Sequence, residues 1–140
     1  MIVAMAVSAA GVFAGDWTGF RGPLGNGLSD EVGLPVKLSA EKHVAWKTAL
    51  PGKGLSSPLV VGDRVFVTAS GGTRQDRLQI LCLNAADGSV IWKRQFWVMG
   101  STMCHKKTSV AAPTPVTDGK LLFAIFSSND LFCLDLDGNL

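Results

Sequence analysis

The chain has 140 residues, of which 17% are charged, and its 13 basic and 11 acidic residues leave a formal net charge of +2. Because these charges are few, balanced and interspersed, the sequence lacks the clustered basic face that nucleic-acid binding requires. With 16 glycines and only short apolar runs, the composition favours an all-β protein over a helical one.

Residues 1–14 carry no charge and are nearly all apolar or small. Val12 and Ala14 occupy the small-residue positions before Gly15, so we predict a secretory signal peptide over 1–14 and export to the periplasm or the medium. The positively charged start of such peptides is missing, and a short buried strand or helix is the alternative. The stretch is shorter than the roughly 20 residues of a membrane span, and no cysteine follows it to accept a lipid.

Residues 15–43 are rich in glycine and predict an irregular segment, pinned by the large side chains Trp17, Phe20 and Arg21. The glycines of 22–27 lack the Lys-Ser/Thr ending of a phosphate-binding loop, so we interpret them as turn residues. Residues 44–50 then alternate in polarity and predict a strand, which Pro51-Gly52 ends.

Residues 57–96 predict four antiparallel strands in succession. We expect them at 57–61, 64–70, 78–84 and 89–96, joined by a two-residue turn, a polar loop and a glycine turn. The third strand is apolar on both faces, which predicts burial on both sides. The fourth carries Lys93 and Arg94, and charges there suit a solvent-facing edge.

The first part of this unit occurs a second time. Residues 57–67 return as 114–124 at a shift of 57, and 81–84 return as 132–135 at a shift of 51. A repeat of roughly 40–50 residues indicates stacked modules that are not stable alone. Four-stranded modules with buried inner strands and a polar last strand predict an all-β protein built as a β-propeller.

Tryptophan and glycine set the register of the modules. Trp46 and Trp92 lie 46 residues apart, and Trp92 follows Gly88 by four. Gly138 corresponds to Gly88, so the next tryptophan is expected at position 142, past Leu140.

The chain should therefore contain about one and a half blades. We expect 44–50 to be the last strand of a preceding blade, 57–96 a complete blade, and 113–140 a blade without its fourth strand. The two outer faces should be apolar, and the remaining blades should be needed for closure.

Three cysteines are present. Cys82 and Cys133 are equivalent in successive repeats, and stacked sheets lie about 10 Å apart. A disulfide needs Cα atoms within about 7 Å, so we predict that these two are not bridged and serve as small core hydrophobes. Cys104 has no predicted partner, and no pair has metal-ligand spacing.

Residues 87–92, Asp-Gly-Ser-Val-Ile-Trp, have the form D-G-x-x-x-W. Together with residues 57–60, 64–67 and 81–84, they resemble the pyrroloquinoline-quinone-like (PQQ-like) propeller repeat. The resemblance implies a structural blade motif in which the glycine starts the turn, the acid caps it, and the tryptophan docks one blade on its neighbour. The residues that it assigns to this motif are Asp87, Gly88, Trp92, Trp46 and Gly138.

The resemblance leaves two functions open. One branch is non-catalytic and includes a propeller lipoprotein that helps assemble outer-membrane proteins, which implies a scaffold for a protein partner or an unknown ligand. The alternative is the N-terminal part of a PQQ-dependent quinoprotein dehydrogenase. That branch uses PQQ, calcium, a vicinal disulfide and an aspartate base, none of which can be assigned here. We therefore predict no catalytic residue, and PQQ and calcium only under the alternative.

Three residues of the crossover between blades, His105, Lys106 and Lys107, are the candidate ligand contacts, because crossovers lie at a propeller face. Without a second ligand, a histidine is more often a hydrogen-bonding loop residue than a metal site. The hairpin tip at 74–77 is expected to be solvated. Asp135 and Asp137 alternate at a strand end, where they either cap the turn or bind calcium.

Overall fold

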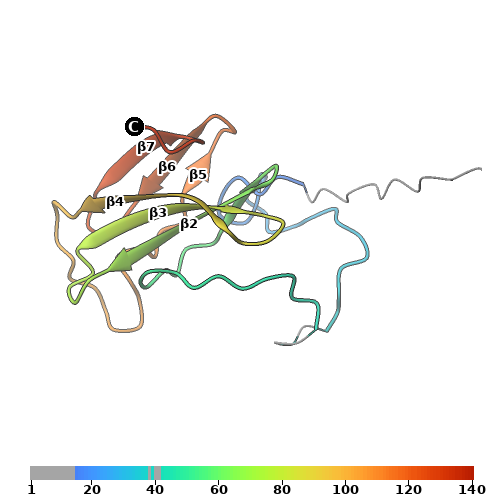
Figure 1. Cartoon of the computed structure of the whole chain (residues 1–140), viewed down its shortest axis with the longest axis horizontal. Helices are drawn as coiled ribbons and strands as arrows, with labels where there is room; N and C mark the ends of the chain where they lie inside the picture. Colours follow the sequence, from blue (N-terminus) through green and yellow to red (C-terminus); the bar gives the residue numbers. More distant parts are fainter. Residues whose placement is uncertain (1–14, 38, 40–41) are drawn as a thin grey trace, which may run out of the picture.

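The computed structural model describes residues 15–37, 39 and 42–140, and consists of two antiparallel sheets joined by long loops (Figure 1). The first sheet has the order β1-β2-β3-β4, and the second has the order β5-β6-β7. The strands of the two sheets are β1 (Leu59–Val61), β2 (Arg64–Gly71), β3 (Arg77–Asn84), β4 (Val90–Trp97), β5 (Val116–Thr117), β6 (Leu121–Ile125) and β7 (Leu131–Asp135). No helix occurs among the described residues, which confirms the all-β class. The predicted signal peptide lies outside them.

Glycine turns explain why each meander folds back on itself. β1 and β2 are joined at Gly62, with φ at 56°, and β5 and β6 at Gly119, with φ at 87°. Tight hairpin turns need this left-handed backbone, which glycine adopts without steric cost. The repeated sequence block therefore produces the same hairpin in both sheets.

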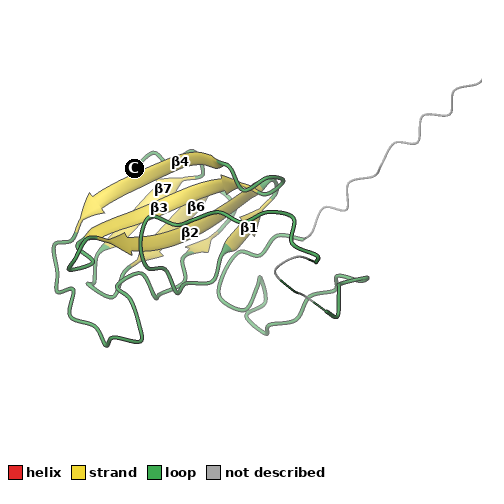
Figure 2. Cartoon of the chain, turned by 60° about the horizontal axis from the view of Figure 1, so that its bottom comes forward, coloured by secondary structure: helices red, strands yellow, loops and turns green. Residues whose placement is uncertain are grey.

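The core lies between the two sheets, which pack face to face (Figure 2). Because side chains alternate along a strand, β2 and β3 send Phe66, Ile80 and Cys82 to this side, and β6 and β7 send Leu122 and Leu134. Each fully buried aliphatic or aromatic side chain contributes roughly 1.5–3 kcal/mol, so this layer joins the two repeats into one unit.

The outer face of the first sheet is covered by the segment that precedes it. Leu81 and Leu83 are only 2% and 3% exposed, because Trp46 and Leu50 pack on them. Residues 44–50 form no strand, since no described strand lies beside them to build a ladder. The prediction of a strand at 44–50 differs from the structure, although this segment does cover the apolar outer face of the first sheet.

The outer face of the second sheet is open and apolar. Its exposed side chains are Val116, Leu121, Phe123, Ile125, Leu131 and Cys133. All three cysteines are free, which confirms the prediction that Cys82 and Cys133 are not bridged. Cys82 is a buried core residue as predicted, but Cys133 is exposed, because no described residue covers the face onto which it points.

The N-terminal segment lies across the first strands of both sheets. Trp17 and Val60 exchange two backbone hydrogen bonds of 2.8 and 3.0 Å, and the Thr117 N–H donates to the Thr18 carbonyl at 3.0 Å. Of the three expected anchors, only Trp17 is partly buried. Phe20 and Arg21 are exposed. The irregular segment therefore ties the blades together mainly through its backbone.

Candidate functional site

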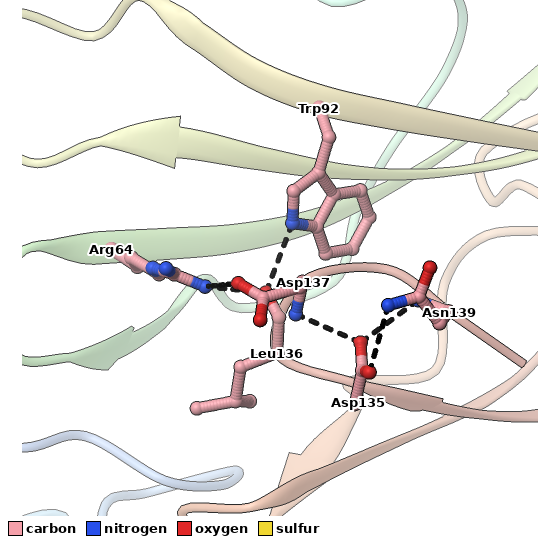
Figure 3. Close-up of polar contacts among 6 residues, drawn as sticks. All are labelled: Arg64, Trp92, Asp135, Leu136, Asp137 and Asn139. Atoms are coloured by element: carbon pink, nitrogen blue, oxygen red, sulfur yellow. Dashed lines mark hydrogen bonds and ion pairs between the residues drawn. The ribbon is translucent and has the colours of Figure 1, made fainter.

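Trp92 of β4 joins the first sheet to the turn that follows β7. Its indole N–H donates to the Leu136 carbonyl at 2.9 Å (Figure 3). The ring lies against Gly138, where a Cβ atom would stand 2.9 Å from the indole and where φ is 84°. Only glycine suits this position, because a side chain would meet both a strained backbone and the ring.

The same arrangement occurs one repeat earlier. The indole N–H of Trp46 donates to the Ala85 carbonyl at 2.8 Å, and its ring lies against Gly88, with φ at 71°. Thr48 adds a hydrogen bond of 2.6 Å to the Gly88 carbonyl. In both repeats, the tryptophan that precedes a blade packs on the last turn of that blade, although Trp46 does not lie in a strand. We call this pairing of indole and glycine turn the blade junction.

Acidic residues hold the junction turns in shape. Asp135 accepts hydrogen bonds from the Asn139 side chain and from the backbone N–H groups of Asn139 and Asp137 (Figure 3). These donors favour the ionised carboxylate and lower the pKa of Asp135, the Asn139 side chain most of all. In the other repeat, Asp87 accepts from the Ser89 hydroxyl and N–H, which lowers its pKa in the same way.

Cationic side chains of the first sheet complete the junction. Arg64 donates to the Leu136 carbonyl at 2.7 Å and forms an ion pair of 2.8 Å with Asp137 (Figure 3). Arg94 donates to the Gly138 carbonyl. Arg94 is exposed on the edge strand β4, as predicted, and its guanidinium also contacts the next blade.

The acidic pair at the end of β7 is thus engaged in protein contacts, Asp135 within its own turn and Asp137 with Arg64. Over the described residues, no group of three or more His, Cys, Asp and Glu side chains lies close enough together to hold a metal ion.

Three loops meet at the opposite end of the strands, at 51–55, 72–76 and 98–110. Gln75 ties two of them together: its amide oxygen accepts from Ser70 at 2.9 Å and from the Val110 N–H at 3.1 Å. Its amide nitrogen donates to the Cys104 sulfur at 3.5 Å. Gln75 was expected to be a solvated tip residue, and nothing in its immediate sequence indicates this linking role.

A pocket of about 400 Å³ lies between the first and third of these loops. It is lined by Gly52, Lys53, Gly54, Leu55, Lys106, Lys107 and Thr108. Two of the predicted contact residues, Lys106 and Lys107, line it, whereas His105 does not. His105 is exposed, and its Nδ1 accepts a hydrogen bond of 3.2 Å from the Lys107 N–H. Sequence reasoning missed Lys53, which comes from a segment 53 residues away from Lys106.

A family model described as outer membrane protein assembly factor BamB (PQQ_2) matches residues 28–140, which include both sheets, both junctions and the pocket. The chain belongs to this family. The match confirms the resemblance to PQQ-like repeat proteins. No curated protein matches the sequence.

In this member of the BamB family, the structure shows where the repeat motif lies. The D-G-x-x-x-W residues run from the turn after β3 into β4 and connect the two described blades. Over the part of the chain that the structure describes, no helix has the length and apolar character to cross a membrane.

Proposed function

We propose that this protein is an exported, non-catalytic β-propeller that serves as a binding or assembly scaffold. The observation on which this rests is the match over 28–140 to the family of an outer-membrane protein assembly factor. The way in which polar side chains are used supports it. Arg64, Arg94 and Asp137 hold one blade against the next, and Asp135 holds the turn that they contact.

Export is supported by the apolar residues 1–14 and by one contact at their boundary. The Gly15 N–H donates to the Glu31 carboxylate at 2.8 Å. Cleavage after Ala14 would turn this N–H into an ammonium group, which the Glu31 carboxylate would then hold as an ion pair. The mature N-terminus should therefore be Gly15, as intact mass of the exported protein would establish.

The propeller requires further blades. The exposed face of β5–β7 is equivalent, by the repeat, to the face of β1–β4 that is buried against it: Cys133 corresponds to Cys82, and Phe123 to Phe66. We propose that another module of the same repeat covers this face in the complete protein.

Site-specific photocrosslinking tests the scaffold. A photoreactive amino acid would replace Met103, which is 92% exposed in the crossover, or Val36, which is 97% exposed in the N-terminal segment. In the cell envelope of the source organism, the complete protein should give discrete crosslinks to envelope proteins from the crossover position.

Two results would overturn the proposal. One is the absence of any crosslink from surface positions in the exported protein. The other is dye-linked alcohol oxidation by the complete protein once PQQ and calcium are added, which would establish the quinoprotein dehydrogenase instead.

A further inference from the structure

The pocket beside the crossover is cationic and is held in place by backbone contacts. Lys53 and Ser70 exchange backbone hydrogen bonds of 3.0 and 2.7 Å, which extend the sheet beyond the end of β1. On the other side, the Leu55 N–H donates to the Ala111 carbonyl at 3.3 Å. The positions of the two loops that form the walls are therefore fixed relative to the first sheet and to the crossover.

The lysines of this pocket have no carboxylate partner in the part of the chain that the structure describes. Lys53, Lys106 and Lys107 are exposed, and among the described residues none of the three forms an ion pair. The carboxylates of Asp130 and Asp76 are not among the residues that line the pocket. Asp130 is buried and accepts from the Ser128 hydroxyl at 2.6 Å, and Asp76 lies beside Gly72. Three like charges around one concavity repel one another, so an anion that enters it relieves this repulsion.

The backbone of the first wall offers further donors. In an antiparallel pairing, the neighbours of a hydrogen-bonded residue point their N–H groups the other way, so those of Gly52 and Gly54 face away from β2. No hydrogen bond joins either N–H to another described residue. A Cβ at Gly52 would overlap the Ser70 carbonyl oxygen, and one at Gly54 would overlap that of Thr68, so glycine lets this wall lie close against β2.

We propose that this pocket binds an acidic segment of a protein partner, with carboxylates paired to Lys53, Lys106 and Lys107. At about 400 Å³ the pocket is much larger than a single small anion. Its charges are ammonium groups on two separate loops, without an arginine fork or helix N-terminus to fix one phosphate. The inference rests on the proposed scaffold function, for which it names a contact surface and a partner chemistry.

A fluorescein-labelled hexaglutamate peptide is the probe, and anisotropy with the complete protein is the measurement. Replacing all three residues (K53Q/K106Q/K107Q) should weaken binding by about tenfold or more, equivalent to about 1.4 kcal/mol. The matched control replaces three lysines outside the pocket with glutamine, Lys37 in the N-terminal segment, Lys93 on β4 and Lys120 in the β5–β6 turn. It should change the affinity less than about twofold, and added salt should weaken the wild-type complex.

Equal melting temperatures of the two variants and the wild type establish that the fold is intact. The inference is overturned if the peptide does not bind, if both variants weaken binding equally, or if millimolar inorganic phosphate displaces the peptide as well as hexaglutamate does. The crosslinks of the scaffold experiment distinguish the two proposals. If they persist in the pocket variant, the scaffold stands and the pocket is not its contact; if they are absent in the wild type, the scaffold itself fails.

Discussion

Gly138 meets two constraints at once, a left-handed backbone and the ring of Trp92. Gly119, also at positive φ, has no atom within 4 Å of the position that a Cβ would take. Gly119→Ala should therefore cost only the backbone strain of roughly 1–2 kcal/mol. Gly138→Ala should cost about 1–3 kcal/mol more, because the indole must move.

Urea denaturation of the complete protein measures both free energies of unfolding. The comparison isolates the contact with the ring, since the backbone change is the same in the two variants. Equal losses of stability would mean that Trp92 does not press on the turn and would contradict the blade junction.

The two equivalent cysteines should differ sharply in reactivity. Burial disfavours the charged thiolate and raises the pKa of Cys82 to about 11, whereas Cys133 is exposed. Since the thiolate is the nucleophile, iodoacetamide at about pH 8 should modify Cys133 and leave Cys82 unmodified until the protein unfolds. Peptide mass spectrometry of the isolated 140-residue chain, at a dilution at which it is monomeric, gives the order, and early labelling of Cys82 would contradict its place in the core.

At the scale of elements, the turn after β7 should make the stability of the folded protein depend on pH in the acidic range. Hydrogen bonds in the folded state lower the pKa of Asp135 below the unfolded value of about 3.9. A depressed carboxyl pKa contributes stability that is complete above about pH 4 and is lost as the pH falls through the folded pKa. Asp135→Asn should therefore flatten the decline of melting temperature between about pH 4 and pH 2.

Asp30→Asn is the control for this variant. It removes one carboxylate from the exposed N-terminal segment, away from the turn after β7. If the melting temperature of Asp135→Asn changes with pH in parallel with that of Asp30→Asn, the hydrogen bonds to the Asp135 carboxylate do not stabilise the folded state.

Strands and turns could be predicted from the sequence where the pattern of neighbouring residues determines them. The second hairpin was predicted because residues 114–124 repeat 57–67, and β3 because its apolar run is buried on both sides. The strand predicted at 44–50 does not form, because an alternating pattern pairs into a ladder only when another strand lies alongside. In the structure this segment packs through Trp46 instead.

The candidate site was only half predictable for a similar reason. Lys106 and Lys107 stand out as neighbours in a crossover, but the pocket also needs Lys53, which is placed there by its pairing with Ser70. The role of Gln75 depends on contacts 29 and 35 residues away, with Cys104 and Val110. Contacts of that range leave no periodic signal in one sequence.

At the scale of the whole molecule, the two sides of the blade pair are unequal. The first sheet has its outer face covered by the segment containing Trp46, while the second sheet leaves a row of apolar side chains in water. An exposed apolar face beside the unpaired edge of β7 favours association with another copy or another sheet. The isolated 140-residue chain should therefore self-associate.

Substitution on that face should restore a monomer. Ile125 and Leu131 are 46% and 63% exposed on the open sheet, so Ile125→Lys/Leu131→Lys places charge where another molecule would pack. Val90 and Ile91 of β4 are 52% and 46% exposed away from that face and provide the control pair. Light scattering after size exclusion should give a lower mass for the first double variant only. In the complete protein a further module should cover the same face, so Cys133 should then resist iodoacetamide; rapid modification there would mean that no blade follows β7.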